Sequence, residues 1–462
     1  MNISKGESTF MYMNQSIADY LKPGCHVHLV GIGGVSMRPL GLVLKGMGVI
    51  VTGSDMNSSA STRELEEAGI PVSIGHRSEN VEGAACVIRT AAAHNDNPEI
   101  AACRAYGIPV FERAQAWGQI MKGYKNALCI SGTHGKTTTT SMMTHILMAA
   151  ETDPTVMIGG HLPLLGAGHR VGSGDTILLE SCEYCDSFLN FFPTIAVVLN
   201  VEADHLDYFK DLADVQDSFR QFARLATQGV IANGDDIHTV EAMAGVNHIT
   251  FGLGEHNRIT AKNMSADWRH FDVVCDGEYY CHLDMAVLGK HNALNALAAA
   301  GAACLLGIDG EAVSRGIGSF HGAGRRMEFK GNWGGAEVYD DYAHHPDEVR
   351  ATISSIRSSM PGRRLVLAFQ PHTYTRTHAL FADFIRELSK SDVVVLAEIY
   401  AARERNTIGI SSRDLAHQIP DAIYCETLPQ VTETLRRIIR PGDMVITMGA
   451  GDIFRAGEAL LK

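Results

Sequence analysis

The sequence predicts an α/β protein built as three successive blocks, each around a largely parallel sheet. Two apolar runs, His26–Val30 and Ala127–Ile130, are each followed by a glycine-containing turn and a helical pattern. After Val338, further short apolar runs each end in a polar cluster, as strands of a parallel sheet do where ligands bind. A chain of 462 residues has room for about three domains. We place them at 1–122, 123–327 and 328–462.

Composition narrows the class of protein. Hydrophobic residues make up 45% and charged residues 20% of the chain, which is ordinary globular usage. The formal charge of −13 argues against a non-specific binder of nucleic acid or of a membrane surface, because both need a basic face. No apolar run is long enough to span a membrane, and the first 15 residues lack the apolar segment of a signal peptide. We expect a cytoplasmic enzyme or binding protein.

The ten cysteines are scattered, so we expect reduced thiols rather than a disulfide framework. Cys182 and Cys185 are the exception, because they form a Cys-x-x-Cys pair. A second Cys-x-x-Cys that would complete a zinc site is missing from the sequence, and the acidic surroundings disfavour thiolates. We therefore expect neither a redox nor a metal role for this pair.

The first block opens with a strand and the turn Gly31-Ile32-Gly33-Gly34, which is typical of a βα turn that binds phosphate. The next strand ends at Asp55, about where a dinucleotide-binding fold places the acid that bonds a ribose hydroxyl. Ser36 stands where the third glycine of that fingerprint would be. From these residues alone, binding of a nicotinamide dinucleotide stays open.

The second block contains the loop that carries most of the functional argument, 131–138, with the sequence SGTHGKTT. Glycines let backbone N–H groups face phosphate oxygens, the following helix adds partial positive charge, and Lys136 adds a full one. Thr137 can place its hydroxyl on Mg²⁺. The common nucleotide loop would need glycine at position 130, where this chain has Ile130, so the loop is a shortened relative. The alternative is a glycine-rich turn that binds nothing.

Two further strands of this block end in polar residues, at Glu180 and at Asn200, and His205 follows shortly after. Ligands gather at the carboxyl ends of parallel strands, so we expect these side chains near Lys136. A carboxylate and an imidazole beside bound phosphates can hold divalent ions, although a single histidine is often structural. Further along, Asn292 and Asn295 share one helix face and could read an adenine edge or simply cap and pack the helix.

The motifs GIGG, GTHGKTT, VEADH, HNALNA, GAGRRMEF, DDYAHHP and FQPHTYTRT occur in this order and together resemble the Mur ligases, from about His26 to the C-terminus. The resemblance implies a Rossmann-like UDP-binding domain, a central P-loop ATPase-like domain and a C-terminal Rossmann-like domain. It also implies a cell-wall reaction, with DDYAHHP, FQPH and GIGG favouring the member that adds the first amino acid. ATP would activate the carboxylate of UDP-N-acetylmuramate as an acyl phosphate, and the amine of L-alanine would attack it, with two Mg²⁺ ions as cofactors.

The same resemblance implies roles for individual residues. The ATP-binding set is Gly132, Thr133, His134, Gly135, Lys136, Thr137, Thr138, His291, Asn292, Asn295, Arg326 and Asp341. The metal ligands are Thr137, Glu180 and His205, with Glu180 shared between the two ions. The residues for the amino acid and the reacting carboxylate are Tyr342, His344, His372 and Arg376, with His344 as the candidate base. The UDP site is Gly31, Ile32, Gly33, Gly34, Asp55 and His76.

Three positions depart from the family pattern. Thr373 follows the histidine of FQPH where many relatives carry arginine, and Arg89-Thr90-Ala91-Ala92 replaces a stretch richer in hydroxyls near the UDP-sugar. Arg220 stands in the region where some relatives carry a carbamylated lysine, so we expect that no carbamate is needed.

Other functions stay open on the sequence. A recycling ligase would join a preformed peptide to the same UDP-muramate, and a sibling would add a later residue. An oxidoreductase would use the first block but would leave the lysine loop unexplained. An ATP-binding module without chemistry is opposed by Glu180, His205 and His344. We expect small-molecule substrates, no nucleic acid, no membrane insertion, and a monomer or weak homodimer.

Overall fold

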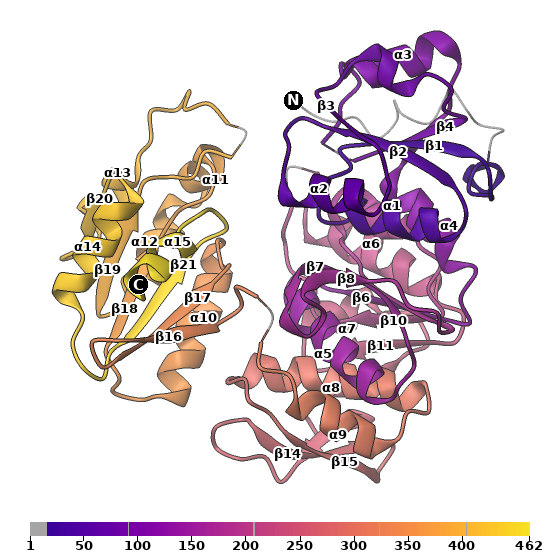
Figure 1. Ribbon diagram of the computed structural model, residues 1–462. Coiled ribbons are helices and arrows are strands. Elements are labelled where there is room, and N and C mark those ends of the chain that lie inside the picture. The colour runs from indigo at the N-terminus through magenta and orange to yellow at the C-terminus, as the bar shows by residue number, and fades with distance from the viewer. Residues whose placement is uncertain (1–15, 91, 207, 323, 403) are drawn as a thin grey trace. The chain divides into compact units, whose positions relative to one another are not determined.

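The computed structural model describes residues 16–90, 92–206, 208–322, 324–402 and 404–462 (Figure 1). The chain forms two compact units. The first contains the described parts of Met1–Lys262, Asp272–His282 and Asn295–Ile317, and the second those of Asn263–Phe271, Leu283–Leu294 and Gly318–Lys462. The three sheets match the three predicted α/β blocks, while the domain boundaries at 122 and 327 stay a prediction.

The first sheet has five parallel strands in the order β3-β2-β1-β4-β5. They are β1 (His26–Val30), β2 (Ile50–Asp55), β3 (Val72–Ile74), β4 (Cys86–Arg89) and β5 (Val110–Glu112). The helices of this part are η1 (Ile17–Asp19), α1 (Met37–Gly46), α2 (Ala60–Glu67), η2 (Ser78–Val81), α3 (Pro98–Tyr106) and α4 (Arg113–Met121). The strand order reverses between β1 and β4, so the turn after β1 lies at the switch point where such sheets bind ligands.

The second sheet has ten strands in the order β15-β14-β13-β12-β11-β10-β6-β9-β7-β8. They are β6 (Asn126–Ser131), β7 (Thr155–Leu162), β8 (Ala167–Arg170), β9 (Thr176–Glu180), β10 (Ile195–Val198), β11 (Gly229–Asn233), β12 (Ile249–Gly252), β13 (Ile259–Lys262), β14 (His270–Cys275) and β15 (Glu278–Asp284). β6 pairs in parallel with β9 on one side and β10 on the other. The segments that follow these three strands therefore emerge at one edge, as the sequence predicted.

The helices associated with this sheet are α5 (Lys136–Ala149), η3 (Pro163–Leu165), η4 (Tyr184–Asn190), α6 (Leu212–Arg224), α7 (Ile237–Ala242), α8 (Lys290–Leu305) and α9 (Gly310–Gly318). The core strand β6 is apolar from Ala127 to Ile130, and all four side chains are fully buried. Helix α5 begins at Lys136, within the loop 131–138, so the positive end of the helix dipole lies at this loop. The fold thus places the predicted phosphate loop on the rigid centre of the sheet.

The third sheet belongs to the second unit and has the order β16-β17-β21-β18-β19-β20, parallel except for β16 against β17. Its strands are β16 (Glu328–Trp333), β17 (Ala336–Asp341), β18 (Leu365–Phe369), β19 (Val393–Ala397), β20 (Ile423–Cys425) and β21 (Met444–Met448). Its helices are α10 (Pro346–Ser359), α11 (Tyr374–Ala379), α12 (Phe381–Leu388), α13 (Ser412–Gln418), α14 (Leu428–Ile438) and α15 (Phe454–Leu460).

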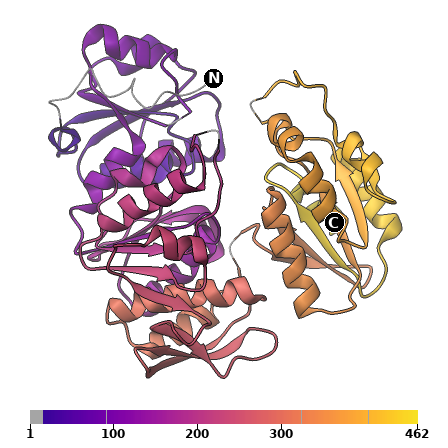
Figure 2. The ribbon, with the colours of Figure 1, turned by 180° about the vertical axis from the view of Figure 1, so that it is seen from behind.

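Helices cover both faces of the third sheet, as Figures 1 and 2 show from opposite sides. Along β18, Leu367 and Phe369 pack into the core beneath α10 and α12, whereas Val366 and Ala368 pack beneath α14 and α15. This strand is apolar throughout because both of its faces are buried. It therefore holds the segment that follows it, from Gln370 onward, on a rigid base.

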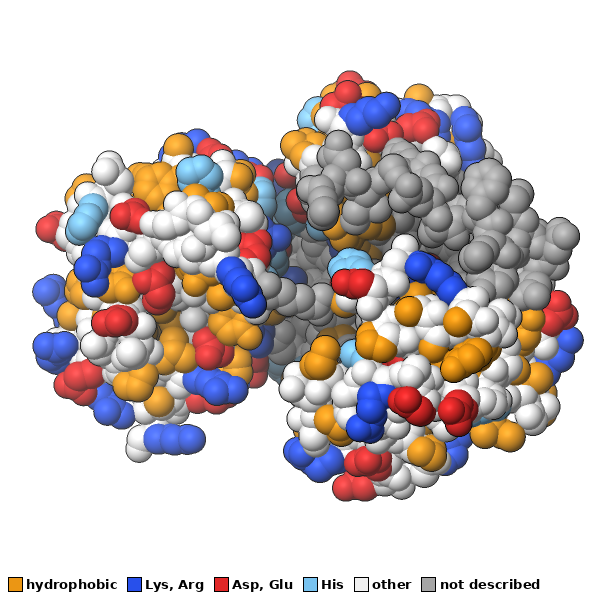
Figure 3. Space-filling model, turned by 90° about the horizontal axis from the view of Figure 1, so that it is seen from above, with side chains coloured by type: hydrophobic (Ala, Val, Ile, Leu, Met, Phe, Trp, Pro, Cys, Tyr) orange, Lys and Arg blue, Asp and Glu red, His pale blue; other side chains and the backbone are white. Residues whose placement is uncertain are grey.

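Positive and negative side chains are interspersed over the faces visible in Figure 3. In the described part of the chain, no helix combines the length and the hydropathy that crossing a bilayer requires.

Candidate active site

The loop between β6 and α5 is clamped by the end of β10. The side chain of Asn200 accepts a hydrogen bond from the backbone N–H of His134 at 2.7 Å and donates one to the carbonyl of the same residue at 3.0 Å. The backbone N–H of Thr133 donates to the carbonyl of Asn200 at 3.0 Å. The predicted meeting of these two strand ends is confirmed. These bonds fix the loop without using Lys136.

Gly135 caps the N-terminus of α5 with a φ of 84°, a conformation that favours glycine. A β-carbon there would lie 2.5 Å from the side-chain oxygen of Asn295. Asn295 therefore packs directly against the loop. Asn292, one turn earlier on α8, donates a hydrogen bond to the carbonyl of Leu288 at 2.8 Å. His291 is exposed, and the adenine role of all three residues stays a prediction.

Lys136 is the first residue of α5 and turns back over its own loop. Its ammonium lies 2.5 Å from the carbonyl oxygen of Gly132 and 3.1 Å from that of Thr133. It also lies 3.0 Å and 3.2 Å from the two carboxylate oxygens of Glu183. Burial by itself would lower the pKa of Lys136, but the attraction of Glu183 outweighs it and raises this pKa above its ordinary value. The ammonium stays charged at neutral pH.

Thr137 and Glu180 form a second pair at the same edge of the sheet. The threonine hydroxyl donates to one carboxylate oxygen of Glu180 at 2.9 Å, and the N–H of Gly159 donates to the other at 2.6 Å. A hydroxyl and a carboxylate are hard oxygen ligands of the kind Mg²⁺ prefers. The predicted pairing of Thr137 with Glu180 is thus present in the geometry, and its metal role stays a prediction.

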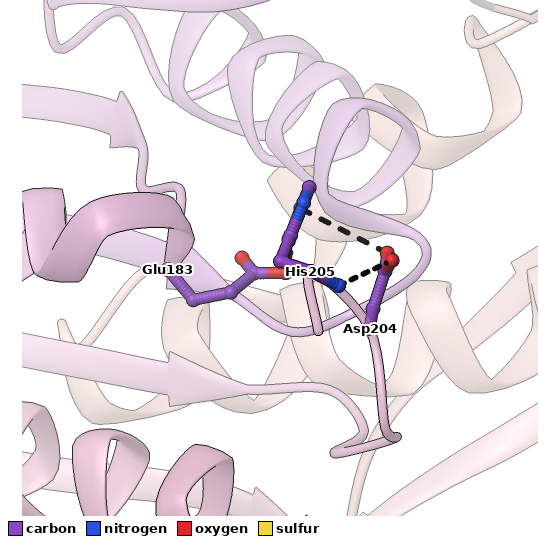
Figure 4. Close-up of side chains that lie close together, drawn as sticks. All are labelled: Glu183, Asp204 and His205. Carbon is purple, nitrogen blue, oxygen red and sulfur yellow. Dashed lines mark hydrogen bonds and ion pairs between the residues drawn. The ribbon is translucent and has the colours of Figure 1, made fainter. Parts of the chain in front are cut away.

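His205 lies beside Glu183 and Asp204, which the sequence analysis did not assign (Figure 4). One ring nitrogen lies 4.0 Å from a carboxylate oxygen of Glu183 and 3.8 Å from one of Asp204. Ligand atoms of the three residues lie within 4.8 Å of one another, the one such group in the described residues. The backbone at His205 has a φ of 54°, an uncommon conformation of the kind found at functional sites.

The neighbouring cysteines, Cys182 and Cys185, form no disulfide, and the absence of a redox or metal role stays a prediction. Both are free thiols, and burial followed by the charge of Glu183 raises the pKa of Cys182 to about 11. Such a thiol is protonated at neutral pH and is a poor nucleophile.

In the first sheet, the backbone N–H of Gly33 donates to a carboxylate oxygen of Asp55 at 3.0 Å. The acid at the end of β2 therefore lies against the glycine turn. The side chain of Ile32 is fully buried against Gly53, so only its backbone is available to a ligand, and its role in a UDP site stays a prediction. His76 pairs at 3.2 Å with Glu99, a fully buried acid that the sequence analysis did not single out.

In the second unit, the side chains after β17 and β18 come together. The rings of His344 and His372 lie 5.9 Å apart, and His344 also faces the ring of Tyr342 at 5.3 Å. A guanidinium nitrogen of Arg376 lies 3.5 Å from Nδ1 of His372. Burial lowers the pKa of His344 and lowers that of His372 to about 4. Both imidazoles are neutral at neutral pH, so Arg376 supplies the charge.

Asp341 is buried at the end of β17. Its two carboxylate oxygens accept hydrogen bonds from the backbone N–H groups of Ala343, at 2.7 Å, and Met327, at 2.9 Å. Arg326 lies over the ring of Tyr342 at 5.2 Å and 3.7 Å from Glu348. Both residues therefore belong to the hydrogen-bonded and ionic structure of the second unit, and their contact with a nucleotide stays a prediction.

Comparison with known proteins decides the family. The model described as "Mur ligase family, catalytic domain" matches residues 26–125, "Mur ligase middle domain" matches 130–303, and "Mur ligase, glutamate ligase domain" matches 325–451. The chain belongs to the Mur ligase family. The resemblance seen in the sequence and the predicted fold class are both confirmed.

This Mur ligase is 44% identical over 450 residues to UDP-N-acetylmuramate–L-alanine ligase of Acetivibrio thermocellus, covering 95% of this chain and 96% of that protein. It is 43% identical to the protein of the same name in Agathobacter rectalis, covering 96% and 99%. Among solved structures, UDP-N-acetylmuramate-alanine ligase from Thermotoga maritima superposes with a TM-score of 0.79 at 28% identity, covering 94% and 98%. A murein peptide ligase from Psychrobacter arcticus shares the fold, with a TM-score of 0.68 at 22% identity, covering 95% and 98%.

Residues at the three departures from the family pattern make local contacts in this Mur ligase. Arg89 is paired with Glu112 at 2.7 Å, whereas Ala91 lies outside the described residues. Thr373 starts α11 with a φ of 68°, and its N–H donates to the carbonyl of Tyr400. Arg220 pairs with Asp217 on α6 at 3.1 Å. That no carbamate is needed there stays a prediction.

Proposed function

We propose that this Mur ligase joins L-alanine to the carboxylate of UDP-N-acetylmuramate and cleaves ATP to ADP and phosphate. The observation that carries the proposal is 44% identity along nearly the whole chain to a protein named for that reaction. The alternative is the recycling reaction on a preformed peptide, and a phosphate-release assay with different amines distinguishes it from ligation of L-alanine.

The loop supports binding of the ATP phosphates through the amides of 132–138 and the ammonium of Lys136. The loop amides are fixed before the nucleotide arrives, because Asn200 holds the loop and the side chains of 127–130 in β6 are fully buried. Preorganised donors stabilise the charge that develops on a transferring phosphoryl group without reorganising during the reaction.

The donor atoms of the site fit Mg²⁺. Thr137 and Glu180 supply oxygen ligands for one ion, and we assign His205 to a second, together with Glu180 as the sequence implies or with Glu183 and Asp204 as their proximity allows. When bound, such ions neutralise phosphate charge and orient the phosphoryl group for attack.

The chemistry needs two displacements. A carboxylate oxygen of the muramyl group attacks the γ-phosphorus and ADP leaves, giving an acyl phosphate. The amine of L-alanine then attacks the acyl carbon, the carbon–oxygen bond to phosphate breaks, and the amine loses a proton. His344 is our candidate to accept that proton, because its lowered pKa leaves the imidazole neutral. Arg376 and His372 are assigned to the amino acid, with Arg376 facing its carboxylate.

We assign the Gly31–Gly34 turn to the diphosphate of the UDP-sugar, with Asp55 and His76 on the uridine side. The turn lies at the switch point of the first sheet, and the bond from Gly33 holds Asp55 against it. We further propose a cytoplasmic enzyme that acts as a monomer or weak homodimer.

The test is release of phosphate from ATP in the presence of UDP-N-acetylmuramate and one amine at a time: L-alanine, glycine, L-serine, or the peptide L-Ala-γ-D-Glu-meso-diaminopimelate. Release that depends on L-alanine and yields the alanyl adduct by mass supports the proposal. Release with the peptide alone identifies a recycling ligase, and no release with any amine overturns both.

A further inference from the structure

We propose that Glu183 is a positioning residue that holds Lys136 on the loop until a nucleotide arrives and then gives the ammonium up to the phosphates. The inference rests on the proposed ATP site and adds a residue to it. Glu183 follows β9 by three residues and is 1% exposed, so its carboxylate interacts with protein groups rather than with bulk water.

Every N–H donor of the Lys136 ammonium already has an acceptor in this arrangement. It has three N–H donors, and four oxygens lie within 3.2 Å of it: the carbonyls of Gly132 and Thr133 and both oxygens of Glu183. A phosphate oxygen can bond Lys136 only if one acceptor leaves. The carbonyls are part of the loop that the phosphates must reach. Glu183 lies on a separate segment and is the acceptor that can be exchanged.

Release of Lys136 would leave a buried carboxylate without its cation, which is costly unless another positive group replaces it. His205 lies beside this carboxylate, with a ring nitrogen 4.0 Å from Glu183. Together with Asp204 the two residues also form a group with the spacing of a divalent-cation site. Glu183 can thus exchange the ammonium for a divalent metal ion, and no covalent bond changes.

This exchange couples nucleotide affinity to metal ions. Without a divalent ion, phosphates must compete with Glu183 for Lys136 and also meet its negative charge. With the ion bound, the charge of Glu183 is neutralised, so both its competition for Lys136 and its repulsion of the phosphates become weaker. Because coupling between two ligands is reciprocal, removal of the Glu183 charge should reduce how much each ligand helps the other to bind.

The test is the affinity for a non-hydrolysable ATP analogue by titration calorimetry, in EDTA and with saturating Mg²⁺. We expect Glu183→Gln, which keeps the side-chain shape, to bind the analogue about tenfold more tightly than wild type in EDTA, or about 1.4 kcal/mol. We expect the gain in affinity from Mg²⁺ to shrink in the same variant. A residue that only supports the fold would not raise nucleotide affinity when replaced.

The matched control is Glu202→Gln, which removes a carboxylate that pairs with His134 of the same loop at 3.4 Å. This side chain is partly exposed and screened, so we expect less than about a twofold change in EDTA. In a Lys136→Met background, Glu183→Gln should gain less affinity than it does with Lys136 present, because only the repulsion between Glu183 and the phosphates is then relieved.

The inference is wrong if Glu183→Gln is folded and binds the analogue in EDTA with the same affinity as wild type. That result would leave the proposed function unaffected. The same holds if the variant binds more weakly, or if its gain in affinity is as large without Lys136 as with it. If Glu183→Gln does not fold, the same measurement is made on Glu183→Asp. Its shorter side chain should weaken the ion pair with Lys136 and so increase the affinity for the ATP analogue in EDTA. A wild-type protein that binds no analogue in either buffer would overturn the proposed function and the inference together.

Discussion

The hydroxyl of Thr137 donates a hydrogen bond to the carboxylate of Glu180 at 2.9 Å, which joins the first turn of α5 to the end of β9. The other oxygen of Glu180 is held by the N–H of Gly159. Two oxygen atoms that we propose as ligands of a metal ion are thus fixed in one orientation by neighbouring strands and a helix.

Replacement of Thr137 by alanine should lower kcat about 100-fold and weaken the apparent affinity for Mg²⁺, because one ligand and the orientation of Glu180 are lost. Thr137→Ser keeps the hydroxyl and should retain activity within about tenfold. Phosphate release measured against Mg²⁺ concentration checks this. An alanine variant with the wild-type dependence on Mg²⁺ would remove Thr137 from the metal site.

Lys136→Met should abolish ligation and also destabilise the protein by about 3 kcal/mol, because Glu183 then stays buried without its cation. The double variant Lys136→Met with Glu183→Gln should recover most of that stability and none of the activity. Denaturant midpoints and ligation assays on the three proteins check the two effects separately. Equal stability of Lys136→Met and wild type would contradict the buried ion pair.

Asp341 should make the second unit less stable as pH rises. Burial raises the pKa of its carboxyl from 3.8 to about 6, so the folded state holds the proton more tightly than the unfolded state does. This contribution to stability is present below about pH 4 and is lost as pH rises through about 6, amounting to about 3 kcal/mol.

The check on Asp341 is the thermal midpoint of wild type and Asp341→Asn across that pH range. The amide in the Asp341→Asn variant places an N–H group opposite a backbone N–H, and this lowers stability by the same amount at every pH. The quantity to compare is therefore the slope of the thermal midpoint against pH in the two proteins. Wild type should lose stability relative to Asp341→Asn as pH rises. A constant difference between the two proteins would contradict the raised pKa.

The amino acid site should depend on Arg376 more than on His372. The pKa of His372, lowered to about 4, leaves its ring neutral at neutral pH, so the guanidinium is the cation that can bind a carboxylate. We expect Arg376→Met to raise the KM for L-alanine about 100-fold and His372→Asn about tenfold. Arg437→Met, an exposed arginine on α14, serves as the charge-loss control. A larger effect from His372→Asn than from Arg376→Met would contradict the assignment.

Local patterns in the sequence were enough to predict the loop at Lys136 and the polar ends of β9 and β10. In each case an apolar strand leads directly into the functional residue, and parallel pairing then brings the ends together. The assembly of Tyr342, His344, His372 and Arg376 follows from the same rule in the third sheet.

Glu183 and Glu99 were missed for a different reason. Glu183 lies beyond its strand, where Cys185 and Asp186 adopt positive φ angles of 55° and 52° and redirect the chain. Glu99 lies on α3, 23 residues from its partner His76. Neither distance can be read from spacing in the sequence, because each depends on how a turn or helix packs. Asp204 was missed as well, although it stands next to His205, and an acid beside a candidate ligand is a signal that could have found it.

The central claim is that a muramyl carboxylate is phosphorylated before L-alanine attacks. The most direct test uses UDP-N-acetylmuramate with ¹⁸O in that carboxylate and follows the label after one round of ligation. Each phosphate released should carry one ¹⁸O, because the bridging oxygen of the acyl phosphate leaves with phosphorus, and the alanyl product should retain the other. Unlabelled phosphate formed together with the alanyl product would contradict the account.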